Sequence, residues 1–414
     1  MTTPLTRPKR KNPILRTRLP TLPPGGRSRT ALAMTAAAAE GRFALQVCKE
    51  CSAVQYPPRE ACHRCLSIRL QWRTQTGEGE LLSQTVLHHS NDLFFRERLP
   101  WRLGMVRLDA AVTVVVHLHG DCAPPPCRVR VQACLDKAGQ AVLFATPIDE
   151  TPHMSDDPQL REMTCDPRLR KVLITDGKTA VGQAMVQALA AAGAELIWVG
   201  QAEPWKKPPG FEAIAALPQV SLVPLDVTDS RSVQELAREI GGKVDILINT
   251  AEYHRTSGIS GRQGVESAKA EMEVNYVGLL RLAQEFAPVM RARGADGVTS
   301  AVAWVNLLSI YALSNFPAHG TFSASKAAAY SLSQCLRAEM RPAGVRVINV
   351  FPGPVEDEWY QLLPPPKLSP ANLANAVVKA LREGVEDVYP GDVAQEWRER
   401  WRDDPKVLER ELGA

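Results

Sequence analysis

At 414 residues the chain is too long for one compact core and predicts two or three domains. With 45% hydrophobic and 23% charged residues, its composition excludes a fibrous or wholly disordered protein. The net charge of +4 is small for this length, and the absence of any run of 18 or more apolar residues predicts that no helix spans a membrane.

The N-terminal segment, residues 1–27, is basic and interrupted by prolines. Residues 1–30 carry eight Lys and Arg residues and no Asp or Glu. We expect a disordered, solvated arm, because the segment offers little apolar surface to bury. Contact with nucleic acid or an anionic lipid surface is the alternative use of such a charge run. No apolar stretch follows the basic start as it does in a secretory signal, so we expect a cytoplasmic protein.

Four cysteines form a cluster after this arm. The Ala-rich segment 28–40 predicts a short helix that begins at Ser28. The two CxxC pairs that follow consist of these residues: Cys48, Cys51, Cys62 and Cys65. Two such turns supply the four thiolates of a closed tetrahedral zinc site, which is structural because no coordination position stays open. The other five cysteines are scattered, which indicates a reducing compartment.

Short β-prone runs follow between residues 72 and 147. They are 81–87, 102–107, 111–118, 127–134 and 141–145. Gly, Pro and Asp turns separate them, which predicts a five-stranded barrel of the OB type. With the cysteine cluster in front of it, the region 28–147 resembles the zinc-ribbon/OB-fold family that accompanies thiolases and acyl-CoA enzymes. The resemblance implies an accessory module that docks on a thiolase-like or other acyl-CoA enzyme, or that binds acyl-CoA.

OB barrels also bind nucleic acids, which gives a rival hypothesis for this module. The predicted strands carry few aromatic residues on which bases could stack, which argues against a nucleic-acid partner.

The sequence pattern changes after residues 148–169, which are polar and predict a linker. Apolar runs alternate with helical segments from residue 170 to residue 392. The runs are 172–175, 196–199, 221–224, 246–249, 303–308 and 346–350. This βαβ alternation predicts a doubly wound, Rossmann-type parallel sheet. The fold class is therefore multidomain, with a small β region followed by an α/β domain, and residues 393–414 are expected to form a helical tail.

The first apolar run leads into a turn that reads Thr175-Asp-Gly177-Lys-Thr-Ala-Val-Gly182. Together with a Ser, an Asn and a Lys described below, it resembles the short-chain dehydrogenase/reductase family. The family's glycine-rich turn holds the pyrophosphate of NAD(P) at a helix N-terminus. Here Asp176 and Ala180 replace two of its three glycines. The positions that the resemblance assigns to cofactor binding are Thr175, Gly177, Gly182, Asp226, Asn249, Pro352 and Gly353.

Other cofactor positions also depart from the family. The family's NNAG segment ends here in Glu252, and Gly200-Gln201 offers neither an acid for the ribose nor an arginine for a 2′-phosphate. These departures argue against NAD(P) binding. Asp226 is alternatively a cap for the helical segment that begins nearby.

The catalytic set of the family is a serine, a tyrosine, a lysine four residues later and a supporting asparagine. Asn275, Ser309 and Lys326 match, but Phe322 stands at the tyrosine position. Loss of a general acid costs about two to four powers of ten in rate. Three matching residues are equally explained by buried hydrogen bonds that hold the fold together.

Three hypotheses follow. The first is a non-catalytic accessory subunit of acyl-CoA metabolism, whose dehydrogenase-like half pairs with an active dehydrogenase subunit or with itself. The second is an active NAD(P)-dependent oxidoreductase of a hydroxyacyl-CoA or ketone, in which Tyr311 or His319 replaces the missing tyrosine. The third is a nucleic-acid-binding module made of the arm, ribbon and barrel.

Overall fold

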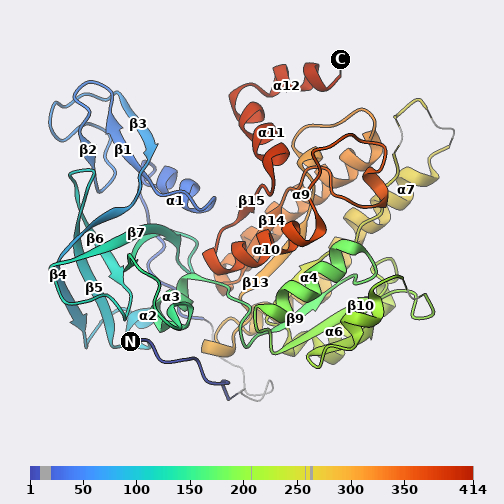
Figure 1. Cartoon of the computed structure of the whole chain (residues 1–414), viewed down its shortest axis with the longest axis horizontal. Coiled ribbons are helices and arrows are strands. Elements are labelled where there is room, and N and C mark those ends of the chain that lie inside the picture. Colours follow the sequence, from blue (N-terminus) through green and yellow to red (C-terminus); the bar gives the residue numbers. More distant parts are fainter. Residues whose placement is uncertain (10–19, 207, 257, 262–263, 414) are drawn as a thin grey trace. The chain divides into compact units, whose positions relative to one another are not determined.

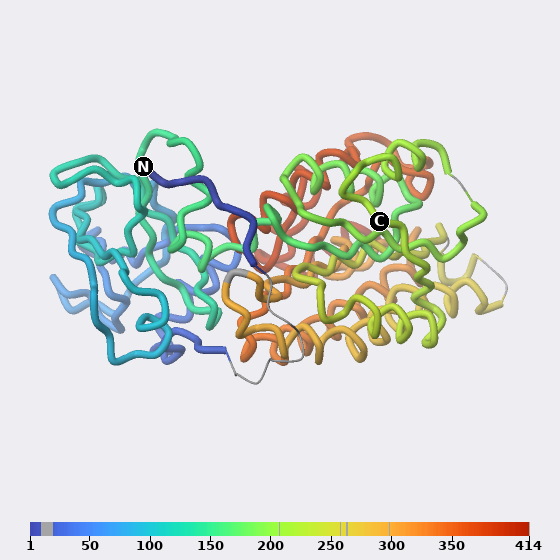
Figure 2. The backbone as a smooth tube through the Cα atoms, turned by 90° about the horizontal axis from the view of Figure 1, so that it is seen from below, coloured from blue at the N-terminus to red at the C-terminus, as the bar shows by residue number. Residues whose placement is uncertain are grey.

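The computed structural model describes residues 1–9, 20–206, 208–256, 258–261 and 264–413. The chain divides into two compact units, which are treated separately below. The first consists mainly of residues 21–166, and the second mainly of residues 167–381 and 386–414. Figures 1 and 2 follow the chain through both units, from blue to red.

The first unit begins with the zinc ribbon. Helix α1 (Leu32–Ala38) precedes an antiparallel sheet of β1 (Ala44–Cys48), β2 (Val54–Gln55) and β3 (Leu70–Thr74), in the order β2-β1-β3. The helix starts later than predicted, because Ser28 accepts a hydrogen bond from the Ala31 N–H in a preceding turn. It ends before Gly41, whose positive φ of 72° reverses the chain.

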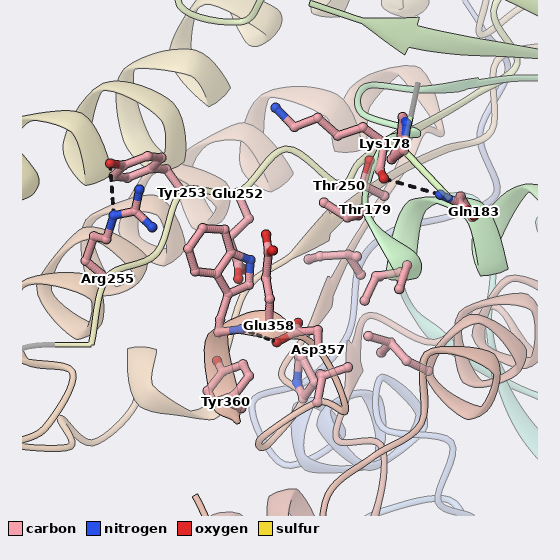
Figure 3. Close-up of a pocket in the computed structure, with 18 of the residues that line it drawn as sticks. Lys178, Thr179, Gln183, Thr250, Glu252, Tyr253, Arg255, Asp357, Glu358 and Tyr360 are labelled. Atoms are coloured by element: carbon pink, nitrogen blue, oxygen red, sulfur yellow. Dashed lines mark hydrogen bonds between the residues drawn. The ribbon is translucent and has the colours of Figure 1, made fainter. Parts of the chain in front are cut away.

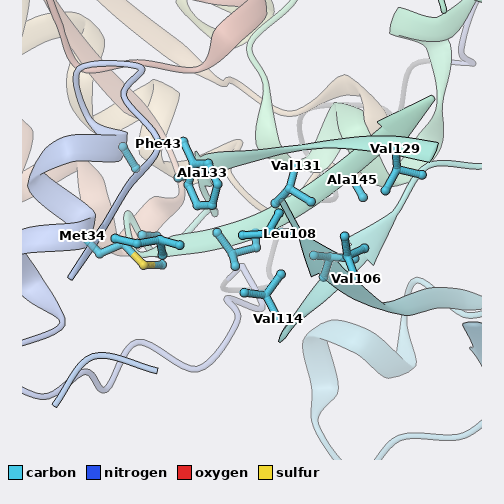
Figure 4. Close-up of a cluster of buried hydrophobic side chains, with 14 of the residues drawn as sticks. Met34, Phe43, Val106, Leu108, Val114, Val129, Val131, Ala133 and Ala145 are labelled. Atoms are coloured by element: carbon cyan, nitrogen blue, oxygen red, sulfur yellow. The ribbon is translucent and has the colours of Figure 1, made fainter. Parts of the chain in front are cut away.

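The five predicted barrel strands are all present. They are β4 (Glu78–Leu87), β5 (Trp101–Leu108), β6 (Thr113–Leu118), β7 (Cys127–Leu135) and β8 (Ala141–Pro147). They close in the order β4-β5-β6-β8-β7, with only β6 and β8 parallel among these pairs. Alternating side chains such as Val106, Val114 and Val131 fill the interior, and Met34 of α1 and Phe43 join the same cluster (Figure 4). The OB-fold prediction is confirmed.

Helical turns or hydrogen bonds occur in two segments that the sequence predicts as a linker and a disordered arm. The expected linker contains a 3₁₀ turn, η2 (Met154–Asp156), and helix α3 (Pro158–Met163), whose Met163 is buried with Phe94 of helix α2 (Leu93–Arg96) and with Trp101. Burial of this apolar side chain explains why the segment folds onto the barrel. In the expected disordered arm, the backbone N–H groups of Thr2 and Leu5 donate to the carboxylates of Asp121 and Asp156. Residues 10–19 of the arm lie outside the described residues.

The second unit is a seven-stranded parallel sheet in the order β11-β10-β9-β12-β13-β14-β15. Its strands are β9 (Lys171–Ile174), β10 (Leu196–Gln201), β11 (Val220–Pro224), β12 (Ile246–Asn249), β13 (Ala303–Leu307), β14 (Arg346–Val350) and β15 (Asp387–Val388). The predicted Rossmann-type sheet is confirmed, and β15 is an additional strand. The order reverses between β9 and β12, so the ligand crevice of such a fold lies beyond the carboxyl ends of these two strands.

Helices connect and cover these strands. They are α4 (Ala180–Ala191), α5 (Phe211–Ala215), α6 (Ser230–Ile240), α7 (Glu266–Met272), α8 (Gly278–Ala292), α9 (Gly320–Met340), α10 (Pro370–Glu383), α11 (Asp392–Asp403) and α12 (Pro405–Leu412). A single π-turn, η4 (Glu273–Val277), joins α7 to α8. The last two helices form the predicted helical tail. Among the described residues no helix is long and apolar enough to cross a membrane.

Candidate functional site

The four clustered cysteines converge at the tip of the ribbon. Their sulfur atoms all lie within 4.8 Å of one another, with Cys48 Sγ 3.6 Å from Cys65 Sγ and Cys51 Sγ 3.5 Å from Cys62 Sγ. Backbone N–H groups of Cys51 and of Cys65 lower the pKa values of Cys48 and Cys62, the latter to about 6. The pKa of Cys65 is shifted the other way, to about 12, by the neighbouring thiols. The convergence of four sulfur atoms is what fits a structural Zn²⁺ site.

Side chains of the turn after β9 accept hydrogen bonds from backbone N–H groups of the same turn. The Asp176 carboxylate accepts a hydrogen bond from the backbone N–H of Lys178 at 2.8 Å, and lies 3.7 Å from the Lys178 ammonium. Burial raises the pKa of Asp176, which the neighbouring Lys178 opposes. Thr179 caps α4 by accepting from the Gly182 N–H at 3.0 Å. An anion at this turn would therefore meet a carboxylate, and two backbone N–H groups of the turn are already occupied.

The glycines of the turn have structural reasons to be present. A Cβ on Gly177 would lie 2.1 Å from Val199 Cγ1, and a Cβ on Gly182 would lie 2.3 Å from the Asp176 carbonyl oxygen.

Thr175 accepts hydrogen bonds from the N–H groups of Thr250 and Ala251 and donates to Asn249 Oδ1 at 2.9 Å. These bonds join β9 to β12.

Asp226, which the resemblance assigns to cofactor binding, also serves the fold. Asp226 Oδ1 accepts from both the N–H and the hydroxyl of Thr228, at 2.8 and 2.7 Å, just before α6. The N-cap of α6 is Asp229, whose side chain accepts from the Arg231 N–H, so Asp226 is not the helix cap that the sequence offered as an alternative.

The lysine of the catalytic set is held by an acid. Lys326 Nζ lies 2.8 Å from Glu252 Oε2 and donates to the Leu307 carbonyl at 3.1 Å. Its side chain is only 2% exposed, and that of Glu252 is 22% exposed. In the resembling family this lysine holds the nicotinamide ribose, and the Glu252 position is a glycine. A side chain of the protein therefore occupies the hydrogen-bonding capacity that the cofactor would use.

Phe322, at the tyrosine position, packs against His254, which contacts a second histidine, His319. The ring of Phe322 stacks on His254, with centroids 3.7 Å apart and planes inclined by 12°. His254 Nε2 lies 2.6 Å from His319 Nδ1, and both rings are fully buried. Burial lowers the pKa of His254 to about 2 and that of His319 to about 4, so both are neutral near pH 7.

Among the residues that the structure describes, no hydrogen bond joins the Tyr311 hydroxyl or a His319 ring nitrogen to Ser309 or Lys326. The Tyr311 ring stacks on Phe316 and His319 at 5.3 and 5.6 Å, and only its backbone N–H contacts Ser309 Oγ, at 3.2 Å. Burial raises the pKa of Tyr311.

Tyr360 is a residue that sequence reasoning missed. Its side chain lies beside Ser309, while burial and Glu252 raise its pKa well above the usual value. It follows the Pro352-Gly353 turn in the 3₁₀ turn η8 (Glu358–Tyr360), and no motif marks this position.

Asn275 lies in the π-turn η4 and is fully engaged. Its Oδ1 accepts from the Tyr253 N–H at 3.1 Å, and its Nδ2 donates to the Tyr253 carbonyl and to Ser325 Oγ at 2.9 and 2.8 Å. The amide thus ties the loop after β12 to α9, which is the structural role that the sequence offered as an alternative.

A cavity of 1030 Å³ lies at the carboxyl ends of the strands. Lys178, Thr179 and Gln183 stand on one side of it, and Glu252, Asp357 and Glu358 on another (Figure 3). Burial and the nearby Glu252 raise the pKa of Asp357 to about 7. Pro352 lines the cavity, whereas a Cβ on Gly353 would approach Val393 of α11 to 3.2 Å. Of the four catalytic-set positions, Asn275, Ser309, Phe322 and Lys326, none lines the cavity.

Comparison with known families agrees with the two-part architecture. The model described as short chain dehydrogenase matches residues 170–363. Two further models, described as the ChsH2 rubredoxin-like zinc ribbon domain and the ChsH2 C-terminal OB-fold domain, match residues 35–69 and 72–136.

Individual proteins match the C-terminal part. An uncharacterized oxidoreductase of Staphylococcus aureus (strain N315) is 29% identical over 217 residues, which cover 51% of this chain and 90% of the relative. The crystal structure of a short-chain dehydrogenase from Burkholderia cenocepacia J2315 in complex with NADP is similar with a TM-score of 0.53 and 31% identity, covering 60% of this chain and 99% of that one. A short-chain dehydrogenase from Streptomyces avermitilis, with a TM-score of 0.51 and 23% identity over 59% of this chain and 96% of that one, shares the fold.

Proposed function

Because the chain belongs to the short-chain dehydrogenase family through residues 170–363, and carries ChsH2-type zinc-ribbon and OB-fold domains before them, we propose that it is an accessory subunit that has lost hydride transfer. The observation that supports this proposal most directly is the ion pair next to Phe322, in which Lys326 Nζ lies 2.8 Å from Glu252 Oε2. Lys326 keeps its place, but its charge is committed to a carboxylate, and Phe322 has no proton to give.

The phosphate end of the crevice supports the same proposal. Asp176 places a carboxylate in the turn and accepts one of its backbone N–H groups. Both acids stand at positions where the family has glycine, Asp176 in the turn after β9 and Glu252 in the segment after β12. As arranged, these residues do not fit NAD(P), and no catalytic step is derived through it. The zinc ribbon fits Zn²⁺, which would contribute to folding of the ribbon.

The partners belong to the same proposal. The zinc-ribbon/OB unit docks on a thiolase-like or other acyl-CoA enzyme, and the dehydrogenase-like unit pairs with an active dehydrogenase or with itself, in the cytoplasm. Such linkage raises the effective concentration of one enzyme near the other. Affinity purification of the tagged chain from its native source tests this, because the proposal requires that a thiolase or a dehydrogenase accompany it. Recovery of the chain with neither enzyme would contradict it.

The proposed loss of hydride transfer is tested by restoring the family's residues at the altered positions. The variants Asp176→Gly and Glu252→Gly return the two positions to the family pattern, and Phe322→Tyr returns the proton donor. We expect NADPH or NADH binding to appear only when both glycines are restored, and ketone reduction only when the tyrosine is added. Reduction by the unaltered chain would overturn the proposal.

A second candidate function rests on Tyr360. It lies beside Ser309, and its side chain lines the cavity. An active oxidoreductase would use its hydroxyl in place of the missing tyrosine, although its raised pKa opposes proton release. If the unaltered chain turns over a hydroxyacyl-CoA or a ketone, Tyr360→Phe should abolish turnover, whereas Tyr311→Phe should not.

A further inference from the structure

The cavity at the carboxyl ends of the strands has an arginine on its wall that uses few of its hydrogen-bond donors. Arg255, in the loop after β12, lines the cavity together with Tyr253 and Trp359. Its Nε donates to the Tyr253 hydroxyl oxygen at 3.1 Å (Figure 3). Among the residues that the structure describes, Nη1 and Nη2 of this guanidinium take part in no hydrogen bond and no ion pair. Both NH₂ groups of the cation are therefore free to donate to a ligand.

Two aromatic rings hold this guanidinium in place. Its central carbon lies over the Tyr253 ring, 4.8 Å from the centroid, and over the Trp359 ring at 5.1 Å. The negative face of each ring attracts the cation, while the N–H groups can still donate in the plane of the guanidinium. The Arg255 side chain is thus positioned before a ligand arrives, which lowers the entropy cost of binding.

Hydrogen bonds also fix the backbone that carries this arginine. The Arg255 backbone N–H donates to Glu271 Oε1 of α7 at 2.9 Å. The Thr256 hydroxyl donates to the Trp359 carbonyl at 3.2 Å, which ties the loop after β12 to the 3₁₀ turn η8. Arg255 and the ring of Trp359 are therefore held in one frame, although they come from different parts of the chain.

The acids grouped on one side of the cavity do not prevent an anion from binding to Arg255. Glu252 is neutralised by Lys326 at 2.8 Å. Burial and the nearby Glu252 raise the pKa of Asp357 to about 7, so near pH 7 only part of the molecules carry this charge. Glu358 is exposed, and solvent and salt screen its charge.

We propose that this cavity binds an organic carboxylate, whose two oxygen atoms accept hydrogen bonds from Nη1 and Nη2 of Arg255. A planar fork of N–H groups matches the two oxygens of a carboxylate in distance and direction. Apolar side chains such as Val355 and Trp359 line the same cavity, which favours an organic ligand over an inorganic anion. The proposal is independent of the loss of hydride transfer, because Arg255 belongs neither to the catalytic set nor to the turn after β9.

Fluorine NMR of 4-fluorobenzoate in the presence of the full chain tests this proposal, with 4-fluorobenzamide as the matched neutral probe. We expect 4-fluorobenzoate to bind at millimolar concentration and 4-fluorobenzamide to bind at least tenfold more weakly, because the amide has no charge and one acceptor oxygen. Inorganic phosphate should bind more weakly than 4-fluorobenzoate, because it has no apolar part. No nicotinamide cofactor is added, so the outcome is separate from that of the NADPH and NADH titrations.

Three variants and a control assign the binding to this arginine. Arg255→Gln should weaken binding of 4-fluorobenzoate at least tenfold, and Arg255→Lys, which keeps the charge and loses the fork, should recover only part of the loss. Tyr253→Phe keeps the ring and removes the oxygen that holds Nε, so it should weaken binding by about twofold to fivefold. Arg231→Gln removes the same charge at an exposed position of α6 outside the cavity and should change the affinity less than twofold.

Thermal unfolding of each variant checks that it is folded, and Tyr253→Phe keeps the test available if Arg255→Gln is not. Four results would overturn the proposal: no binding of 4-fluorobenzoate at millimolar concentration, equal binding of 4-fluorobenzamide, tighter binding of phosphate, or unchanged affinity in the folded Arg255 and Tyr253 variants.

Discussion

The pair of Glu252 and Lys326 gives a prediction about stability that does not depend on any cofactor. In Glu252→Gln the side chain keeps its shape and loses its charge, so the Lys326 ammonium, 2% exposed, loses its neutralising partner. Breaking a buried ion pair from one side costs about 3–5 kcal/mol. Glu252 is 22% exposed, and the Leu307 carbonyl still accepts from Lys326, so we expect about 2–3 kcal/mol.

The measurement is unfolding in urea, monitored by the hydrogen exchange of peptides from β12 and β13. These peptides report on the dehydrogenase-like unit alone. The matched variants are Lys326→Met and the double variant. The double variant should lose less stability than the sum of the two single variants, by about 1 kcal/mol or more, because it leaves no unpaired charge. Additivity within about 0.5 kcal/mol would show that the two groups do not interact and would refute the reasoning.

Three further predictions follow from buried groups and close contacts. Burial lowers the pKa values of His254 and His319 to about 2 and about 4, so below about pH 6.5 the unfolded chain takes up protons that the folded chain does not. The free energy of unfolding should therefore fall as the pH drops from 6.5 to 5, by at most about 1.4 kcal/mol per pH unit for each ring; values independent of pH in this range would contradict this. Removal of zinc by a chelator should increase hydrogen exchange in the ribbon strands and leave the parallel sheet unchanged; unchanged exchange in both units would argue against a structural metal. Gly177→Ala should destabilise the dehydrogenase-like unit by about 1–3 kcal/mol, because its Cβ would lie 2.1 Å from Val199 Cγ1, whereas Gly261→Ala, with nothing within 4 Å, should be neutral in thermal unfolding; equal melting temperatures for the two variants would disprove the close contact.

Much of the fold follows from local pattern. The parallel strands are runs of buried apolar residues separated by helices, and their predicted and observed ends differ by at most two residues. For example, β12 and β14 begin and end where the sequence predicts. Strand β15 has only two residues, too few for any period to show. The ordered segment 154–163 was missed because only two apolar residues in a mostly polar stretch, Leu160 and Met163, pack against the cluster.

The candidate site was only partly predictable. The substitutions at positions 176, 252 and 322 are visible in the sequence because a fixed spacing defines the family pattern. What they do is not visible, because Glu252 meets Lys326 across 74 residues, and His254 meets His319 across 65. Such pairs depend on how the loop after β12 packs against α9. Tyr360 was missed for the same reason, since only the folded chain brings its side chain beside Ser309.

Calorimetric titration of the unaltered chain with NADPH and NADH tests the central claim most directly. The arrangement of Asp176 and Glu252 predicts that neither cofactor binds at millimolar concentration, while the Asp176→Gly/Glu252→Gly variant binds at least one of them. Tight binding of either cofactor to the unaltered chain would contradict the account, because it would show that the two carboxylates do not close the crevice.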